Sequence, residues 1–525
     1  MQRHKNIFYN ILLVIAIINY IVFSGLYIYR TSILCRNKRY FTLWDDAMIS
    51  MRYAKNFARG NGLVWNVNEE RVQGFSNMGI TLLMSLIHLF PIDVSKTSLV
   101  FQILNLVILL LIFLLVLFIA KNLFNDSNAI SLAAFITTSF CYSLLIWSLQ
   151  GSDAGFIALW ITGIIALLVN KNMKVYPNPF CFWAVMGLGL LLRVDTIMIY
   201  GIVTVSLLLF DKENRIKNLI LGLTVLFVIY GCFMIFNYLY YGDLLPNTFY
   251  LKLTGIPIKL ILHRGWQVFI KDLARNGPLL IFASISFFCT KKKNIVSTCL
   301  LIISSILVFN IIIGGDWLDD YGSRFVAPVF PLILILASGG LWYTLKKIIP
   351  TKFYKFKLVE ILFFLGIVVM VLLSNKPLCI REWCRIKFQQ SDTMYRDTYK
   401  RYLIAALYLN DNTLSTTSIG VHWAGVLPYF CERPMVDFLG LNDKQIAKKK
   451  VNCFDVPGHS KWDWDYIILE RRPDIILVTS RGLESNPYFL EYYNKLQSKK
   501  FKKPFYVHKE AIKKILEPNA TIYEQ

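Results

Sequence analysis

Long, predominantly apolar runs constrain this chain more than any other feature. Residues 7–29, 100–120, 216–240 and 295–313 each approach or exceed the roughly 20 apolar residues that cross a hydrocarbon core. The chain has 525 residues and is 56% hydrophobic, above the roughly 45–50% apolar content of soluble proteins. The runs therefore predict a polytopic all-α membrane domain.

Basic residues in alternate loops predict the topology, because loops rich in Lys and Arg stay on the cytoplasmic side. The assignment of basic loops to the cytoplasmic side gives about eleven transmembrane helices and a cytoplasmic N-terminus. It divides the chain into a membrane domain, residues 1–373, with a first outer loop at 30–97, and an outer tail, residues 374–525. The segment 79–90 is too short to span, so we expect an interfacial or re-entrant helix there.

The tail has a different pattern from the rest of the chain. Residues 418–421 and 475–479 look like buried strands among glycine-containing turns, which predicts a small extracytoplasmic α/β domain. Lysine runs near 444–450 and 499–503 are most simply a solvated face, and contact with anionic lipid or glycan is the alternative. Glycan binding by this domain stays an open alternative at this point.

Composition also excludes some classes of function. The net charge of +23 does not indicate a nucleic-acid partner, because no zinc-finger spacing or base-reading basic helix accompanies it. The six histidines show no metal spacing, so no metal site and no cofactor are predicted. A divalent cation is compatible with the sequence, although no cluster of protein ligands for it is evident.

Two adjacent carboxylates, Asp45 and Asp46, follow the first apolar run by a short loop. They precede residues 47–59, which have helical spacing. One interpretation is structural, an N-cap and a first-turn acid that stabilise this helix. The other is chemical, because carboxylates beside a bilayer commonly move protons, hold a cation or act as a catalytic base. We favour a catalytic role for at least one of them.

Arg193 and Asp195 lie between two short apolar segments, 180–192 and 196–210, which we expect to meet on the outer side. An interfacial ion pair or a snorkelling arginine explains this pattern without function. Phosphate binding by the guanidinium fork of Arg193 is the functional alternative. The loops 241–252 and 314–317 also have two interpretations. They are either turns at a membrane interface or sites that bind sugar.

Several motifs resemble one known superfamily. They are residues 45–56 (DDAMISMRYAKN), 60–66 (GNGLVWN), 71–77 (RVQGFSN), 245–248 (LPNT) and 314–317 (GGDW), with Arg324-Phe325 and residues 420–441 of the tail. The chain resembles the GT-C membrane glycosyltransferases, and within them the mycobacterial terminal β-1,2-arabinofuranosyltransferase family. Relatives often have Arg-Pro-acid where this chain has Arg193-Val194-Asp195.

The resemblance implies a fold and an activity. The fold is of GT-C type, and the acidic motif of the first outer loop matches Asp45 and Asp46, one of which acts as the general base. The donor is a sugar, such as arabinofuranose, linked to polyprenyl phosphate in the lipid bilayer. The acceptor is a cell-envelope glycan or glycolipid, and transfer inverts the anomeric centre. The location is the bacterial inner membrane, with the active site facing outward.

Other outer-loop residues take supporting roles in this interpretation. Candidates for binding the donor phosphate are Arg193, Lys252 and Arg324. Candidates for binding substrate are Arg52, Asn77, Gln150, Asp153, Asp195, Asn247, Tyr250, Asp316, Trp317 and His422. The rival class is an ion-coupled transporter or a non-catalytic lipid-glycan binding protein, although no inverted repeat is evident and the acids lie at one interface.

Overall fold

The computed structural model describes residues 2–124, 128–170, 179–316, 324–350, 358–374, 396–478, 481–497, 504–516 and 521–523. The chain forms two compact units. The first, the helical unit, comprises Met1–Arg30, Gln102–Phe233 and Ile261–Thr393. The second, the mixed unit, comprises Thr31–Phe101, Met234–Leu260 and Met394–Gln525.

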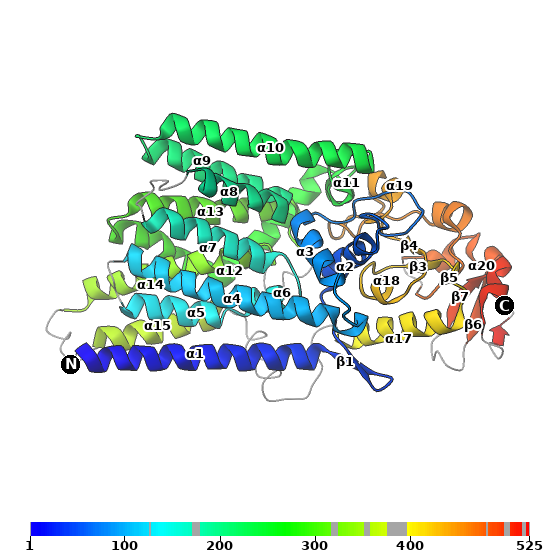
Figure 1. The fold of residues 1–525 in the computed structure, drawn as a ribbon, viewed down its shortest axis with the longest axis horizontal. Coiled ribbons are helices and arrows are strands. Elements are labelled where there is room, and N and C mark those ends of the chain that lie inside the picture. The colour runs from blue at the N-terminus through cyan, green and yellow to red at the C-terminus, as the bar shows by residue number, and fades with distance from the viewer. Residues whose placement is uncertain are drawn as a thin grey trace. The chain divides into compact units, whose positions relative to one another are not determined.

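Helices that run side by side build the helical unit (Figure 1). Those that lie wholly or mostly within it are α1 (Gln2–Thr31), α4 (Val94–Leu123), α5 (Asn128–Ser139), α6 (Tyr142–Leu149), α7 (Ala154–Asn170), α8 (Pro179–Leu192), α9 (Ile197–Phe210), α10 (Arg215–Tyr241), α12 (Ile258–Cys289), α13 (Lys293–Ile312), α14 (Phe330–Ile348) and α15 (Leu358–Ser374). Every predicted span coincides with one of these helices or with the α5–α6 pair.

Length and composition divide these helices into groups. Within the described ranges, five helices are long and apolar enough to cross a membrane: α1, α4, α10, α13 and α14 with the turn before it. The α5–α6 pair, bent by 47°, makes a sixth if it counts as one span. Helices α7, α8, α9 and α15 are apolar but shorter. These helices make the chain a multi-pass membrane protein.

Helix α12 differs from its prediction. The expected span covered only residues 277–289, whereas the helix begins at Ile258 and contains Pro278. Its first half carries charged residues such as Arg264 and Asp272, which explains why hydropathy did not reveal it. At Gly265 the helix lies so close to α13 that an added Cβ would collide with the Ile311 carbonyl. Small residues permit such close helix packing in membrane proteins.

Short helices and two sheets build the mixed unit. The helices are α2 (Asp45–Ala58), α3 (Met78–His88), α11 (Asn247–Leu253), α17 (Arg396–Asn412), α18 (Val426–Phe430), α19 (Lys444–Lys448) and α20 (Phe489–Tyr492). The strands are β1 (Ile33–Cys35), β2 (Lys38–Tyr40), β3 (Ile419–Val421), β4 (Met435–Asp437), β5 (Ile475–Ile476), β6 (Tyr493–Gln497), β7 (Phe505–His508) and β8 (Thr521–Tyr523).

The larger sheet has six strands in the order β4-β3-β5-β7-β6-β8. Strand β3 pairs in parallel with both β4 and β5, and the remaining pairs are antiparallel. The predicted strands at 418–421 and 475–479 are therefore confirmed as β3 and β5, although residue 479 lies outside the described residues. Because β3, β4 and β5 run in parallel, their carboxyl ends share one edge of the sheet.

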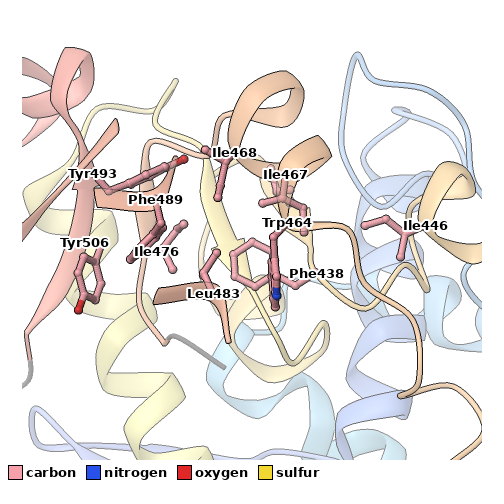
Figure 2. Packing of buried hydrophobic residues seen from close by; sticks show 11 residues of the cluster. Phe438, Ile446, Trp464, Ile467, Ile468, Ile476, Leu483, Phe489, Tyr493 and Tyr506 are labelled. Atoms are coloured by element: carbon pink, nitrogen blue, oxygen red, sulfur yellow. The ribbon is translucent and has the colours of Figure 1, made fainter. Parts of the chain in front are cut away.

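Aromatic and aliphatic side chains form the core beside this sheet (Figure 2). Phe438 and Trp464 meet edge to face with ring centroids 5.6 Å apart. Phe489 lies 4.8 Å from Tyr506 on β7, measured between ring centroids. Each buried ring removes a large apolar area from water, so this cluster is a main source of stability for the tail.

The compact units do not follow the predicted domain boundary at residues 373 and 374. The first outer loop and residues 234–260 belong to the same compact unit as the tail. Sequence order suggested otherwise, because these segments are separated from the tail by long apolar helices. The fold thus joins the acidic motif, the α11 loop and the α/β tail within one unit.

Candidate active site

The acidic pair occupies the first turn of α2, where the helix dipole favours negative charge. Asp45 points inward: its carboxylate accepts hydrogen bonds from the backbone N–H groups of Gly425, at 3.2 Å, and Val426, at 2.9 Å. Its own N–H donates to the Tyr399 hydroxyl at 3.1 Å. Asp45 therefore holds α2 against the start of α18 in the tail.

Burial determines the acidity of Asp45. Only 4% of the residue is exposed, and burial raises its pKa to about 7. The N–H of Val426 lowers this pKa and the charge of Asp46 raises it, but burial is the largest effect. The fit is tight, because a Cβ at position 425 would collide with the Asp45 carbonyl oxygen.

Asp46 meets the opposite environment, since it is exposed at the same turn of α2. Of the two predicted catalytic residues, it alone presents its side chain to solvent in the described structure. A base must reach the proton that it abstracts. Asp46 is therefore the more accessible of the two acids, and Asp45 makes structural contacts.

Arg52 lies two turns further along α2 and is buried. Its guanidinium has five N–H donors, and all five are used. They donate to the Trp65 carbonyl, to Asn66 Oδ1 and to the carbonyls of Pro428, Cys431 and Arg433. These hydrogen bonds join the first loop to the tail, and substrate binding by Arg52 stays a prediction.

Tyr53 makes a second link between α2 and the tail. Its hydroxyl donates to the Val72 carbonyl at 2.7 Å and lies 2.9 Å from Asn442 Oδ1. Asn442 in turn donates to the carboxylate of Asp437, which is buried at the end of β4. No sequence pattern signals this link, because its partners are hundreds of residues apart.

The α11 loop supplies three of the predicted site residues. Asn247 is buried, and its Nδ2 donates to the carbonyls of Gly440, Leu441 and Asp443. The Tyr250 ring lies 4.8 Å from Lys448 Nζ. Lys252 packs against Gly458: a Cβ atom added at Gly458 would lie 3.5 Å from Lys252 Cε. This loop therefore packs along the tail.

Asn77 and His422 complete the predicted residues of the mixed unit. Asn77 Oδ1 accepts a hydrogen bond from Ser50 of α2 at 3.0 Å. His422 directly follows β3, at the carboxyl edge of the parallel strands. Burial, together with the smaller effects of the His459 and Arg481 charges, lowers the pKa of His422 to about 4, so His422 is neutral at pH 7.

Aromatic and basic residues that the sequence did not single out accompany His422. The Arg481 guanidinium lies 4.7 Å from the Trp462 ring. Trp423 lies 6.4 Å from Tyr402, measured between ring centroids. All four are partly buried residues of the mixed unit. For Trp462, the signal that could have found it is the pair of tryptophans in the polar stretch that follows Gly458.

In the helical unit, Arg193 is buried and paired with two carboxylates. Its Nε and Nη2 donate to the two oxygens of Asp195 at 2.5 and 2.8 Å, and its Nη1 lies 3.2 Å from Asp153 Oδ1. The cluster carries one positive and two negative charges. This charge balance supports the ion-pair interpretation over phosphate binding.

Arg324 lies near the same aromatic ring as Arg193. Its Nε lies 3.0 Å from Asp316 Oδ2. The ring of Phe325 lies 5.2 Å from the Arg324 guanidinium and 5.3 Å from that of Arg193. Gln150, another predicted substrate-binding residue, donates a hydrogen bond from its Nε2 to the Tyr27 hydroxyl at 2.6 Å. Trp317 lies outside the described residues.

The predicted site residues thus form two groups. In the mixed unit are Asp45, Asp46, Arg52, Asn77, Asn247, Tyr250, Lys252 and His422, and in the helical unit are Gln150, Asp153, Arg193, Asp195, Asp316 and Arg324. Among the described residues, no group of three or more His, Cys, Asp or Glu side chains is arranged to hold a metal ion.

Comparison with known proteins gives similarity mainly at the level of fold. A family model described as a domain of unknown function (DUF8728) matches residues 390–521. A search of curated protein sequences finds no match.

Solved structures match over most of the chain. ArnT from Cupriavidus metallidurans in the apo state has a TM-score of 0.57 at 13% identity, covering 95% of this chain and 98% of ArnT. The same enzyme bound to undecaprenyl phosphate has a TM-score of 0.51 at 13% identity, covering 81% and 85%. The oligosaccharyltransferase AglB from Archaeoglobus fulgidus, in complex with an inhibitory peptide and a dolichol-phosphate, has a TM-score of 0.56 at 11% identity, covering 99% and 76%.

These likenesses define the class of fold. A bundle of apolar helices together with a C-terminal α/β domain is the GT-C type of membrane fold, and this chain has it. The predicted fold class is confirmed. At 11–13% identity, the comparisons do not extend to the arabinofuranosyltransferase family.

Proposed function

We propose that this protein is a membrane glycosyltransferase that uses a polyprenyl-phosphate sugar donor. The observation that carries the proposal is the exposed carboxylate of Asp46, held at the first turn of α2 by the buried contacts of Asp45. The GT-C fold supports it, because solved structures with this fold contain undecaprenyl phosphate or a dolichol-phosphate.

The proposed reaction is one displacement at the anomeric carbon. An acceptor hydroxyl attacks this carbon, and its proton passes to the Asp46 carboxylate as the new C–O bond forms. The bond from the anomeric carbon to the phosphate oxygen breaks on the opposite face, so the configuration inverts. Polyprenyl phosphate leaves with the electron pair, and Asp46 later returns the proton to solvent. A positioned base of this kind contributes about 10²–10⁴-fold.

The departing phosphate needs a positive charge nearby. Of the three predicted cations, Arg193 is the weakest candidate, because the negative charges of Asp153 and Asp195 together exceed its single positive charge. Arg324 forms an ion pair with Asp316. Lys252 belongs to the same compact unit as Asp46 and lies beside Gly458. We therefore favour Lys252, with Arg324 as the second candidate.

The carboxyl edge of β3, β4 and β5 is the proposed acceptor surface. His422 and Trp423 follow β3 and lead directly to Gly425, which contacts Asp45. Aromatic faces and planar cations such as Arg481 suit sugar rings and their hydroxyl groups. The acceptor is proposed to be a glycan or glycolipid of the cell envelope, and the tail to face the outside of a bacterial inner membrane.

Reconstitution tests the proposal. Purified protein in lipid nanodiscs receives polyprenyl-phosphate donors with radiolabelled sugars, beginning with arabinofuranose, together with envelope oligosaccharides. We expect transfer to continue in the presence of EDTA, because no cofactor or metal is proposed. Asp46→Asn should reduce transfer by at least about 10²-fold without lowering the melting temperature.

Asp45→Asn is the matched control at the neighbouring position. It should lower the melting temperature and reduce transfer only in proportion to the folded protein that is lost. If Asp46→Asn retains wild-type turnover, the base lies elsewhere. Passage of solute across sealed vesicles without any transfer would instead favour the transporter class.

A further inference from the structure

An apolar groove lies between α2 and α3, away from the acidic pair. It is lined by Phe57, Ala58 and Gly60 at the end of α2 and by Gly79, Leu82, Leu83, Ser85, Leu86 and Leu89 of the α3 segment, and its volume is about 470 Å³. All of these residues belong to the mixed unit. Grooves of this size bind small molecules in other proteins.

The α3 segment is apolar on its outer face as well as its inner one. Met78, Ile80, Met84 and Ile87 are buried within the unit. On the opposite side, Leu86, Leu89 and Phe90 are 55%, 64% and 65% exposed. A helix that is apolar all round normally has apolar surroundings on every side. Water is a poor environment for this face, so the groove requires a cover.

The position of α3 in the chain indicates what covers it. Only residues 89–93 separate α3 from α4, a candidate membrane span of 30 residues. Five residues reach at most about 17 Å. At 1.5 Å per residue, α4 is about 45 Å long and exceeds the roughly 30 Å hydrocarbon core, so its polar first turns extend into the headgroup layer. The end of α3 is therefore within about 17 Å of the first turn of α4.

Basic residues close in sequence to the groove-lining residues fit the same environment. Lys96 is exposed in the first turn of α4, and Arg59, which pairs with Glu432, follows the last turn of α2 with half of its side chain exposed. Exposed cations next to an apolar face are typical of helices that lie in a membrane surface, where they reach lipid phosphates.

We propose that this groove binds an acyl chain of a bilayer phospholipid, so that α3 lies in the membrane interface and anchors the mixed unit to it. The proposal commits to phospholipid, because the cover follows from continuity with α4 and not from the donor chemistry. It is independent of the proposed transferase activity.

Photo-crosslinking tests the occupant. The protein with a benzophenone amino acid at Leu86, or in a second variant at Leu89, is placed in nanodiscs of phosphatidylethanolamine and phosphatidylglycerol and irradiated. Mass spectrometry then identifies the adducts. The matched negative control is Leu490, which is 49% exposed on α20, and the positive control is Leu111, which is 44% exposed on α4.

We expect phospholipid adducts at Leu86 and Leu89. Their amounts should approach the amount at Leu111 and exceed the amount at Leu490 several-fold. Adducts at the Leu490 level would overturn the proposal, as would crosslinks to protein or to added polyprenyl phosphate in place of phospholipid.

Filling the groove tests the site itself. A further variant carries the benzophenone amino acid at Leu83, which lines the groove. Adding Ala58→Trp should reduce its phospholipid adduct several-fold, while the adduct at Leu111 stays unchanged. An unchanged Leu83 adduct in the folded variant would show that lipid lies outside the groove and overturn the acyl-chain assignment. If this variant does not fold, the comparison of Leu86 with Leu490 still decides.

Discussion

Two aspartates that share one helical turn have opposite surroundings. Asp45 is buried against the N–H groups of Gly425 and Val426, whereas Asp46 is exposed. A buried carboxylate is unfavourable when it is charged, which is why its pKa rises. The structural role of Asp45 and the proposed catalytic role of Asp46 can therefore be tested separately.

The pH dependence of stability should reveal Asp45. The pKa of its carboxyl group is about 7 in the folded protein, against an ordinary value of 3.8. Between these values the folded state binds more protons than the unfolded state, so stability falls as pH rises, by up to about 1.4 kcal/mol per pH unit. We expect the melting temperature of the wild type, relative to Asp45→Asn, to fall between pH 5 and pH 8. A constant difference would mean that Asp45 is ionised throughout.

The sequence predicted the residues of this turn but not their division of roles. Helical spacing and two adjacent acids were sufficient to place a helix start, and α2 begins at Asp45. The partner of Asp45 is 381 residues away, and no local pattern contains that information. The contacts of Arg52 were hidden for the same reason, because the carbonyls of Pro428, Cys431 and Arg433 that it binds all lie in the tail.

At the scale of elements, α2 is held by its contacts with the tail more than by its own sequence. Arg52→Ala would leave several buried acceptors without donors, each costing about 1–3 kcal/mol. We expect the apparent melting temperature to fall by more than about 5 °C.

Arg59→Ala provides the matched control on the same helix. Arg59 pairs with Glu432, and both side chains are about half exposed, so its removal should change stability by less than about 1 kcal/mol. Equal melting temperatures for the two variants would contradict the structural role of Arg52.

The junction of α8 and α9 gives a second test at this scale. The two short helices and the break between them at Arg193 were predicted correctly, because charge interrupts the apolar pattern there. Arg193→Ala would leave Asp153 and Asp195 without their cation, and we expect a loss of about 3–5 kcal/mol in stability. Adding Asp195→Asn should restore part of it.

Donor binding distinguishes the two interpretations of Arg193. The ion-pair interpretation predicts that the surviving folded Arg193→Ala protein binds lipid-phosphate donor normally. Unchanged thermal stability together with weakened donor binding would instead return Arg193 to the phosphate site.

At the scale of the whole molecule, apolar length and loop charge were sufficient to predict a bundle of membrane helices with an α/β tail. Each predicted span coincides with a helix because an apolar run of this length is satisfied only in a helix. The association of residues 31–101 and 234–260 with the tail was not predictable, since it depends on tertiary contacts. The six-strand order of the sheet was equally hidden, because several strands have only two or three residues.

The topology itself remains a prediction that labelling can check. A cysteine at Ser485, which is exposed in the tail, should react with an impermeant reagent in intact cells beyond the wild-type background. A cysteine at Lys291, between α12 and α13, should react only after lysis. The reverse pattern would invert the membrane orientation.

The contact between Asp45 and α18 also has a consequence for biosynthesis. A ribosome that has just made Asp45 must add about 380 more residues before the amide groups of Gly425 and Val426 exist. Contacts this distant in sequence form late in folding, because a large loop must close first. A nascent or truncated chain therefore holds its acidic turn without the partner that orients it. Synthesis of the segment that contains Gly425 and Val426 must therefore precede assembly of the acidic turn.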